Sequence, residues 1–377
     1  RKLIFFVRTA FGLILQSTVS IYPERSTFEK DAAYLDLAHQ YGFQRVFTSL
    51  LEVSGDQEAV LGNFKRVVAH ANQLGMQVMI DINPGLFKQL GISYDNLSFF
   101  HELGAWGIRL DNGFTGQEEA EMTRNPFNLK IEINMSQGTS YVDNIMSYSP
   151  KRENLLGCHN FYPHRFSGLG EDFFKQCTAQ FAKYNLNTAA FVNSHEATFG
   201  PWPTQDGLPT MEVDRDLTMA TQMKHYVLMD NIDDIIVGNA YASEAELKTM
   251  HDVFNAEFPA IAIDVADDIT ADERKVLFES LHSYRGDRSE YLLRSTMTRV
   301  IFKDLPFPAH HTVDIQRGDI LIDNVGYGQY KGETQIALKA MPNDGRVNVV
   351  GRITPTELFL LDYLKPWSQF KLVPASH

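Results

Sequence analysis

The chain has 377 residues, of which 44% are hydrophobic and 21% are charged. This length predicts about two domains, and the apolar content is enough for a large buried core. The formal net charge of -13 would repel a phosphate backbone and no local basic patch offsets it, so we expect no nucleic-acid partner. Two cysteines, Cys158 and Cys177, are too few for a disulfide framework, and a reducing cytoplasm is the expected location.

The chain begins with a basic and then apolar stretch, Arg1–Gln16, that is somewhat like a signal peptide. Arg8 interrupts the apolar run, no small-residue cleavage site follows, and the run is too short to span a membrane. We therefore treat residues 1–17 as a leader of doubtful status, packed or frayed against the domain that follows, and expect no membrane partner.

From Thr18 onward, short apolar runs alternate with longer amphipathic ones, a pattern typical of βα units around a parallel sheet. Helices are predicted from a capping box at Ser26 and over Glu58–Leu74, for example. The rival fold, a doubly wound open sheet, needs a glycine-rich turn after its first strand, and Pro23–Arg25 contains no glycine. The sequence thus predicts a (β/α)8 TIM barrel. Its eight strands are Thr18–Tyr22, Arg45–Thr48, Val78–Ile82, Gly107–Leu110, Lys130–Ile133, Leu155–His159, Thr188–Val192 and Asp234–Gly238.

After Phe258–Pro259 the pattern changes to short strands and turns, with one helix predicted over Ala271–Ser283. Turn residues such as Asn343–Asp344–Gly345 separate the strands. The predicted strands are Asp319–Ile322, Thr334–Ala337, Val347–Val350 and a closing stretch to Phe370. We therefore expect a catalytic barrel over residues 18–258 and a compact β-rich domain over residues 259–377.

Polar and aromatic side chains recur where the predicted strands end, which is where barrels place their active sites. The candidate catalytic carboxylates are Glu24, Asp81, Asp111 and Glu132. The candidate substrate-binding residues are Asn83, Arg109, Asn134, His159, Asn160, Tyr162, His195 and Asn239. Sugar-processing barrels need this mixture, because two carboxyl groups must flank a glycosidic bond while amides and aromatic rings hold the sugar.

Two pairs of carboxylates meet the spacing of a retaining glycosidase, which is roughly 5 Å. Adjacent strands lie about 4.8 Å apart, so either Asp81 with Asp111 or Asp111 with Glu132 qualifies. Structural roles compete with catalysis, since Asp111 could cap the following helix and Glu132 could pair with Arg109. For His159, the sequence favours a core position over a catalytic one. No His-x-His or His-Glu-x-x-His spacing occurs, so we expect no metal or cofactor.

Motifs at several strand ends and in the second domain occur together and in order. They are Ser20–Glu24, Tyr41–Leu51, Asp81–Pro84, Gly107–Gly113, His159–Pro163, Arg317–Ile320 and Asn348–Gly351. Together they resemble a bacterial family, once labelled outer surface proteins, that is now linked to 6-phospho-N-acetylmuramidase activity. The resemblance covers nearly the whole chain from Thr18. It implies a barrel with a cyclophilin-like β domain, and cytoplasmic hydrolysis of a disaccharide of N-acetylmuramic acid 6-phosphate and N-acetylglucosamine in peptidoglycan recycling.

A phosphorylated substrate requires cations or backbone amides in the site. Arg109 is well placed, and Lys151–Arg152 could also reach. Barrels commonly bind phosphate in the loops after strands seven and eight, where Asn239 and Ser243 precede a helix N-terminus. The loop His195–Arg215 is long enough to form a lid or a sugar-stacking wall.

Two other functions remain open at this point. One is a metal-dependent epimerase or aldolase acting on a sugar phosphate, since barrels host many reactions. The other is a non-catalytic carbohydrate-binding surface protein. The second domain carries no catalytic motif, and its Tyr327, Tyr330 and Arg299 either close over the barrel mouth or pack within the domain. The sequence does not predict the oligomeric state.

Overall fold

A computed structural model describes residues 16–50, 57–201 and 203–376 of the chain. The predicted leader lies outside this part of the chain except for its last two residues. The chain divides into two compact units, one running to Tyr226 and including Asp230–Phe254, the other formed by Val227–Met229 and the residues from Asn255 onward.

The first unit is a closed barrel of eight parallel strands in chain order, which confirms the predicted fold. Its strands are almost fully buried, as expected when helices cover the outside and side chains fill the interior. The strands are β1 (Gln16–Ile21), β2 (Arg45–Leu50), β3 (Gln77–Ile82), β4 (Gly107–Leu110), β5 (Lys130–Asn134), β6 (Leu155–Cys158), β7 (Asn187–Val192) and β8 (Asp234–Val237).

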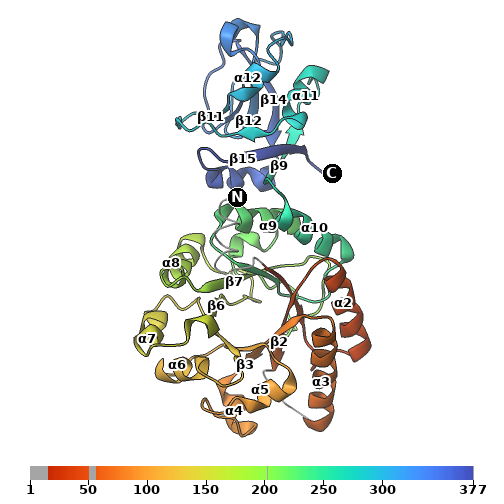
Figure 1. Ribbon diagram of the computed structural model, residues 1–377. Helices are drawn as coiled ribbons and strands as arrows, with labels where there is room; N and C mark the ends of the chain where they lie inside the picture. Colours follow the sequence, from red (N-terminus) through yellow and green to blue (C-terminus); the bar gives the residue numbers. More distant parts are fainter. Residues whose placement is uncertain (1–15, 51–56, 202, 377) are drawn as a thin grey trace. The chain divides into compact units, whose positions relative to one another are not determined.

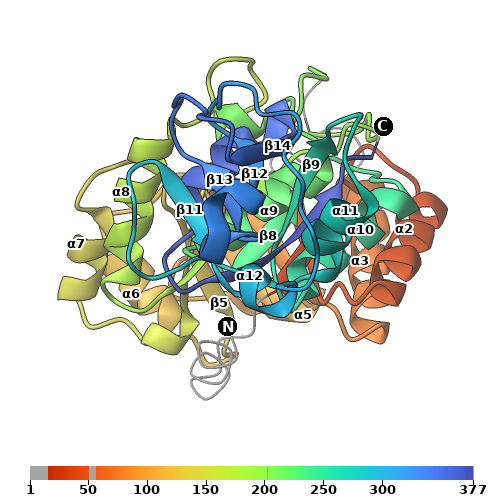
Figure 2. The same ribbon diagram turned by 90° about the horizontal axis from the view of Figure 1, so that it is seen from above.

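Helices surround the barrel, with α2 and α3 side by side on one flank and α6, α7 and α8 on the opposite flank (Figures 1 and 2). The helices of this unit are α2 (Phe28–Gln40), α3 (Gln57–Gln73), α4 (Pro84–Gln89), α5 (Ser98–Leu103), α6 (Gln117–Thr123), α7 (Tyr141–Ser147), α8 (Glu171–Ala182), α9 (Met219–Met229) and α10 (Glu244–Asn255), with short 3-10 turns η1 (Arg152–Asn154) and η2 (Glu212–Asp214).

Two local predictions at the start of the barrel were wrong. The first strand begins at Gln16 rather than Thr18, because Gln16 already pairs with Asp234 of β8. The cap of α2 is Thr27, whose side chain accepts a hydrogen bond from the Lys30 amide (3.4 Å). Ser26, the predicted cap, instead donates to the Tyr22 carbonyl (3.1 Å), which ties the end of β1 to the start of this helix.

The second unit is built on a seven-stranded mixed sheet in the order β10-β15-β9-β14-β12-β13-β11. Figure 2 shows β11, β13, β12, β14 and β9 in this order across the sheet. The strands are β9 (Ala260–Val265), β10 (His282–Ser283), β11 (Leu292–Ser295), β12 (Asp319–Asp323), β13 (Thr334–Ala337), β14 (Val347–Ile353) and β15 (Gln369–Pro374). Helices α11 (Ala271–Glu279) and α12 (Met297–Ile301) and the 3-10 segments η3 (Val325–Tyr330) and η4 (Pro355–Tyr363) complete the unit.

The predicted β-rich character of this unit is confirmed, while its cyclophilin-like nature stays a prediction. A core that includes Ile261, Val276 and Phe370 joins the sheet to α11. The helix predicted over Ala271–Ser283 was too long, because its last two residues pair with β15 as strand β10.

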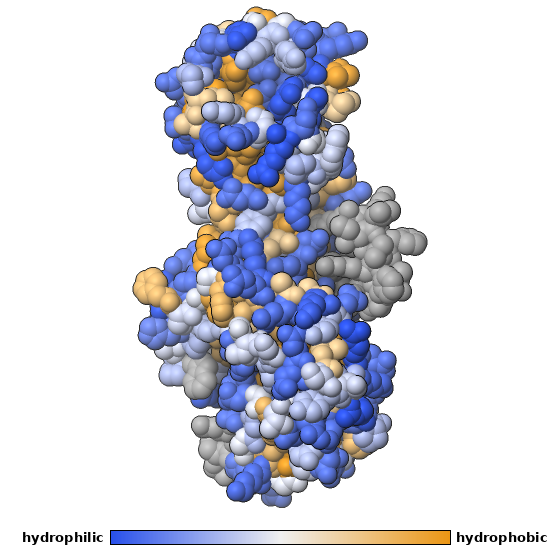
Figure 3. Space-filling model, turned by 90° about the vertical axis from the view of Figure 1, so that its left-hand side faces the viewer, coloured by the Kyte–Doolittle hydropathy of each residue, from blue (hydrophilic) through white to orange (hydrophobic). Residues whose placement is uncertain are grey.

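On the face drawn in Figure 3, hydrophilic side chains predominate over the barrel unit and hydrophobic ones are scattered among them. Within the described residues, no helix is both long and apolar enough to cross a membrane.

Candidate active site

The register of three adjacent strands brings charged side chains together inside the barrel. Asp81 on β3 pairs with Arg109 on β4, and Arg109 pairs with Glu132 on β5. All three side chains are buried, with residue exposures of 4%, 2% and 3%. Asp111 follows β4 at the C-terminal ends of the strands, which we call the barrel mouth.

Arg109 is the centre of this group. Its Nη1 atom contacts Asp81 Oδ1 at 3.0 Å and Asp111 Oδ1 at 3.5 Å, and its Nε atom lies 4.0 Å from Glu132 Oε1. Its Nη2 atom donates to the side-chain oxygen of Asn160. We call these five residues the Arg109 cluster. One guanidinium thus faces three carboxyl groups.

Burial raises the pKa values of two carboxyl groups in this cluster. It raises the pKa of Glu132 to about 7, although Arg109 opposes the shift. Burial also raises the pKa of Asp81, again against the effect of Arg109. Asp111 differs from both, since 44% of its side chain is exposed. The cluster therefore combines two buried acids whose pKa values are raised with one solvent-accessible carboxyl group.

The Asp81 and Asp111 carboxyl groups lie close to each other because both contact the Nη1 atom of Arg109. Their Oδ1 atoms can be no further apart than the sum of the two contacts, 3.0 Å and 3.5 Å. This limit includes the ~5–5.5 Å separation of retaining glycosidase pairs and falls at the lower edge of the ~6.5–9.5 Å range of inverting pairs. Asp111 does not cap α6, because the Glu119 carboxylate accepts from the Gly116 amide there (2.5 Å).

Amides line the mouth beside the cluster. Asn134 donates to the Asp111 carbonyl (3.4 Å) and accepts from the Ser136 amide (2.8 Å). The Ser136 hydroxyl accepts from the Asn160 amide (3.0 Å), which fixes the segment that follows β6. Tyr162 is half-buried in the same segment, and burial raises its pKa. Asn134, Asn160 and Tyr162 are therefore held beside the carboxyl groups.

His159 belongs to the barrel core and not to the mouth. It is fully buried, and its ring stacks on Phe174 with centroids 4.4 Å apart. Its Nδ1 and Nε2 atoms bond the hydroxyls of Ser136 (3.0 Å) and Thr178 (2.9 Å). Burial lowers its pKa to about 3, so the ring is neutral. Both ring nitrogens are occupied, which corrects the expectation that His159 binds substrate.

The expected phosphate position at the start of α10 already holds a carboxylate. Ser243 and Glu246 form reciprocal capping contacts, each of 3.2 Å. Glu246 also accepts from the His195 amide (3.0 Å) and from the Ser194 hydroxyl. The Asn239 side chain bonds the Ser194 amide (2.8 Å) and carbonyl (2.7 Å). An anion at this helix end would meet Glu246, and the Ser-x-x-Glu spacing in the sequence was the available signal for it.

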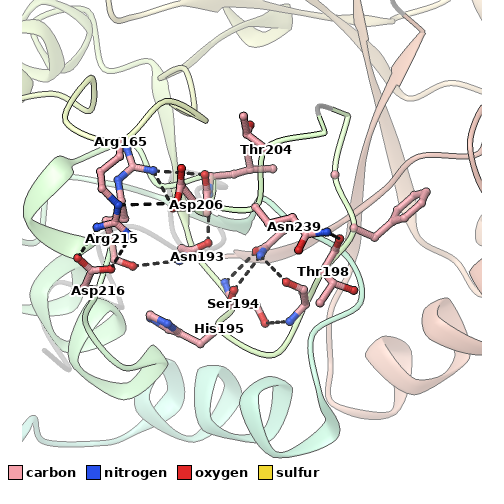
Figure 4. Close-up of a pocket in the computed structure, with 16 residues that line it drawn as sticks. Arg165, Asn193, Ser194, His195, Thr198, Thr204, Asp206, Arg215, Asp216 and Asn239 are labelled. Carbon is pink, nitrogen blue, oxygen red and sulfur yellow. Dashed lines mark hydrogen bonds and ion pairs between the residues drawn. The ribbon is translucent and has the colours of Figure 1, made fainter.

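A pocket of about 110 Å³ lies beside this network, between the segments that follow β6, β7 and β8. Figure 4 shows Arg165 and Arg215 beside Asp206 and Asp216 on one side, and Asn239 with Ser194 on the other. Arg215 is buried and forms a two-point contact with Glu212, with both distances 2.7 Å.

Arg165 is more accessible than Arg215. Its side chain is 38% exposed and pairs with Asp216, itself 72% exposed, at 2.7 Å. Sequence patterns gave no signal for Arg165, which lies in an irregular loop. His195 is exposed, and its Nε2 atom lies 2.7 Å from the Leu217 carbonyl, which leaves it at the rim of this pocket.

Aromatic rings gather where β1 and β8 end. The Phe199 ring lies 5.7 Å from Tyr241 and 6.3 Å from Tyr22, and the Phe199 backbone forms two 2.7 Å hydrogen bonds with Ala240. The long loop after β7 is therefore anchored on the barrel at this point. The expected wall also includes Trp202, which lies outside the described residues.

Two further candidates lie in turns at the mouth. Glu24 is half-buried in the turn after β1. Asn83 is exposed and caps α4 by accepting from the Gly85 amide (2.9 Å).

The basic pair Lys151–Arg152 lies at the opposite end of the barrel. It precedes β6, so it belongs to the N-terminal ends of the strands, which we call the barrel base. Lys151 pairs there with Glu153 (2.9 Å), and Arg152 donates to the Tyr184 carbonyl (3.1 Å). The expectation that these cations reach a phosphate at the mouth was wrong. No set of three or more potential metal ligands is grouped in the part of the chain that the structure describes.

A (β/α)8 barrel with several carboxyl groups at its mouth, followed by a β-rich unit, defines the class of this protein as a two-unit barrel protein. Two family descriptions match consecutive parts of the chain, namely 6-phospho-N-acetylmuramidase N-terminal over residues 18–252 and 6-phospho-N-acetylmuramidase C-terminal over residues 259–373. The chain therefore belongs to the 6-phospho-N-acetylmuramidase family, a family of glycosidase-type enzymes, which confirms the resemblance found in the sequence.

Two solved structures are similar to the chain over nearly all of its length. An uncharacterized protein of B. cereus is 45% identical, covering 96% of this chain and 99% of that protein, with a TM-score of 0.87. A conserved protein of unknown function from Enterococcus faecalis is 25% identical, covering 96% and 97%, with a TM-score of 0.73. No curated protein matches the chain.

Proposed function

We propose that the protein is a glycosidase that hydrolyses the bond between N-acetylmuramic acid 6-phosphate and N-acetylglucosamine. The observation that carries the proposal is the contact of Asp81 and Asp111 with a single nitrogen of Arg109 at the mouth of a barrel of this family. Two neighbouring carboxyl groups of unequal exposure are what glycoside hydrolysis needs. A cytoplasmic location and a part in peptidoglycan recycling remain predictions.

The unequal environments of the two carboxyl groups suggest their roles. Asp81 is buried and its pKa is raised, so it is suited to donate a proton to the glycosidic oxygen as the bond to C1 breaks. Asp111 is accessible and held by Arg109, so it is suited to attack C1 and form a glycosyl-enzyme intermediate. Water then replaces Asp111 at C1, while Asp81 takes the proton from that water. The short separation of the pair favours this retaining course.

Glu132 and Arg109 have supporting roles in this scheme. Glu132 is 3% exposed and lies in the barrel interior, with its Oε1 atom 4.0 Å from Arg109 Nε. Arg109 orients both aspartates, and Asn134, Asn160 and Tyr162 are placed to bond sugar hydroxyl and acetamido groups. Glu24, Asn83, His195 and Asn239 stay candidates at the edge of the mouth.

We place the substrate phosphate in the pocket of Figure 4, on Arg165. Its contacts with Asp216 (2.7 Å) and Asp206 (3.7 Å) are both exposed, and such surface pairs are weak, so a doubly charged phosphate can replace these carboxylates. Arg215 is a poorer candidate because Glu212 and backbone carbonyls already occupy its guanidinium.

One assay tests the proposed reaction. The protein is incubated with the 6-phosphorylated disaccharide and, separately, with its unphosphorylated form, and released N-acetylglucosamine is measured. We expect release from the phosphorylated form at the higher kcat/KM. Release from neither sugar would refute the hydrolase assignment, and preference for the unphosphorylated sugar would refute the phosphate assignment. Product identity separates this activity from the epimerase or aldolase alternative, because only hydrolysis frees the amino sugar.

A further inference from the structure

The sheet of the C-terminal unit uses its two faces differently. Along β12, Ile320 and Ile322 point into the main core of the unit, whereas Leu321 joins a separate small cluster with Val347. Asp323 lies two residues after Leu321 and therefore on the same face. This second face carries both apolar side chains and a buried acid.

A cleft of about 570 Å³ opens on this second face, entirely within the C-terminal unit. Apolar side chains form one part of its lining: Leu292, Ile315, Leu321, Met341 and Val347. Arg294, Asp323 and Gln335 line a polar part, and Tyr327 and Tyr330 of η3 complete the wall. The volume falls in the ~300–1,000 Å³ range of small-molecule sites.

Asp323 is the feature of the cleft that points to a ligand. The residue is 3% exposed, and its Oδ2 atom accepts a hydrogen bond from Gln335 Nε2 (3.1 Å). Among the described residues, its Oδ1 atom has no hydrogen-bond partner. Burial raises the pKa of Asp323 to about 7, helped by the nearby Glu333. The Oδ1 atom is not fully enclosed and Asp323 lines the cleft, so a ligand in the cleft can donate a hydrogen bond to it.

Charges around the cleft are balanced, which favours an uncharged ligand. Arg294 makes a two-point contact with Glu333, of 2.6 Å and 3.0 Å, and Arg299 lies 3.6 Å from the same carboxylate. Glu333 therefore occupies the guanidinium of Arg294, the arginine that lines the cleft, and Asp344 at the cleft pairs with Arg346 (2.5 Å). A phosphate would find no unpaired cation at Arg294 and would approach both acids.

The two tyrosines form an aromatic corner. Their ring centroids are 6.3 Å apart, and the rings are nearly perpendicular at 88°. Arg346 packs on the Tyr327 ring at 4.2 Å and Arg299 on the Tyr330 ring at 4.7 Å. The arginines hold the two rings in place before a ligand binds. Stacking of a sugar face on these rings would therefore cost little side-chain entropy. Tyr327 and Tyr330 thus pack within their own unit, the second of the two expectations for them.

We propose that this cleft is a second binding site of the protein and takes an uncharged N-acetylated amino sugar. The acetamido N–H donates to Asp323 Oδ1, its methyl group contacts the apolar lining at Leu321, and the sugar ring stacks on the tyrosine corner. The choice of an amino sugar over other small acetamides rests on the proposed function. The site itself needs no contribution from the barrel.

The test is hydrogen–deuterium exchange of the full chain with the β-1,4-linked disaccharide of N-acetylglucosamine, which carries no phosphate. We expect protection of peptides spanning β12 and η3. Protection confined to peptides of the barrel mouth, or no protection at all, would overturn the proposal. Protection of the cleft by an acetylated dipeptide amide but not by the sugar would also overturn it. The hydrolysis assay tests the proposed function separately, so a failure of the cleft proposal can be distinguished from a failure of the proposed function.

Three variants complete the experiment. Tyr330→Ala removes the more exposed ring and is expected to weaken binding at least tenfold, roughly the effect of one lost stacking contact. Tyr291→Ala is the matched control, since Tyr291 is an exposed tyrosine of the same unit outside the cleft lining. Asp323→Asn is expected to weaken binding by about the same factor. The side-chain oxygen of the new asparagine keeps the hydrogen bond from Gln335, so its NH2 group replaces Oδ1 and faces the N–H of the ligand, where two donors meet. Equal binding by wild type and both cleft variants would contradict the site.

Discussion

Each end of the barrel contains a buried arginine that contacts carboxyl groups, but the number of carboxyl groups around it differs. At the base, Arg45 faces one carboxylate, that of Asp234, at 2.7 Å. Asp234 also accepts from Thr18 (2.8 Å), and Arg45 stacks on Trp106 at 4.1 Å. At the mouth, Arg109 faces three carboxyl groups. A matched pair neutralises itself, whereas an excess of acids raises the pKa of some of them. We therefore propose a structural role for the pair at the base and a catalytic role for the group at the mouth.

The largest expected effect is on catalysis at the mouth. Asp81→Asn and Asp111→Asn each remove one carboxyl group while keeping its shape and its place beside Arg109. We expect kcat to fall by on the order of 10³-fold or more in each case, because acid–base and nucleophilic roles carry this much of the rate. Steady-state kinetics on the phosphorylated disaccharide measures it. Less than a tenfold loss in both variants would remove the pair from the mechanism.

The second effect is on stability at the base. Asp234→Asn leaves Arg45 buried without its counter-ion, and such losses cost about 3–5 kcal/mol, or on the order of 10 °C in melting temperature. Thermal melting followed by circular dichroism measures the shift. The double variant Arg45→Met with Asp234→Leu is expected to recover most of it, since apolar replacement removes both buried charges. An unchanged melting temperature for Asp234→Asn would show that the base pair is not structural.

The third effect is a pH dependence from Glu132. Its folded-state pKa of about 7 lies above the ~4.3 of an unfolded glutamate, so the folded state holds the proton more tightly. The contribution of Glu132 to stability is therefore greatest at low pH and declines as pH rises from about 4 to 7, with no further change from this group above that. Urea unfolding at pH 5 and pH 8 is expected to show a smaller difference for Glu132→Gln than for wild type, by on the order of 3 kcal/mol. An identical difference in both proteins would contradict the assigned shift.

The smallest expected effect is on substrate affinity, and it distinguishes an arginine at the mouth from an arginine at the base. Arg165→Ala is expected to raise KM for the phosphorylated disaccharide roughly tenfold, as expected for one charge-assisted hydrogen bond, and to leave KM for the unphosphorylated form unchanged. Arg152→Ala at the base is the control and is expected to change neither. Equal KM values for Arg165→Ala and Arg152→Ala would place the phosphate elsewhere.

The barrel and the β-rich unit could be predicted because their strands are continuous apolar runs bounded by turns. The Arg109 cluster was partly predictable, since Asp81, Arg109 and Glu132 occupy the interior positions of three consecutive strands. The burial that raises the pKa of Glu132 arises from contacts across the barrel and has no local pattern in the sequence. The sequence left His159 between a core position and the substrate site for the same reason, because Thr178, one of its partners, lies on a helix nineteen positions further along the chain.

The cleft of the C-terminal unit could not be foreseen from motifs. Asp323, Tyr330 and Gln335 belong to three separate segments that the sheet order brings together. The alternation of Ile320, Leu321 and Ile322 contains no polar residue, so it did not distinguish the core face from the cleft face.

One comparison tests the central claim most directly, namely kcat for Asp111→Asn at the mouth beside kcat for Asp234→Asn at the base. Both variants replace one aspartate that contacts a buried arginine, and turnover of the phosphorylated disaccharide is measured per folded molecule at a temperature where both are folded. The account predicts a loss on the order of 10³-fold for Asp111→Asn and a change within about threefold for Asp234→Asn. Equal losses, or a larger loss at the base, would contradict it.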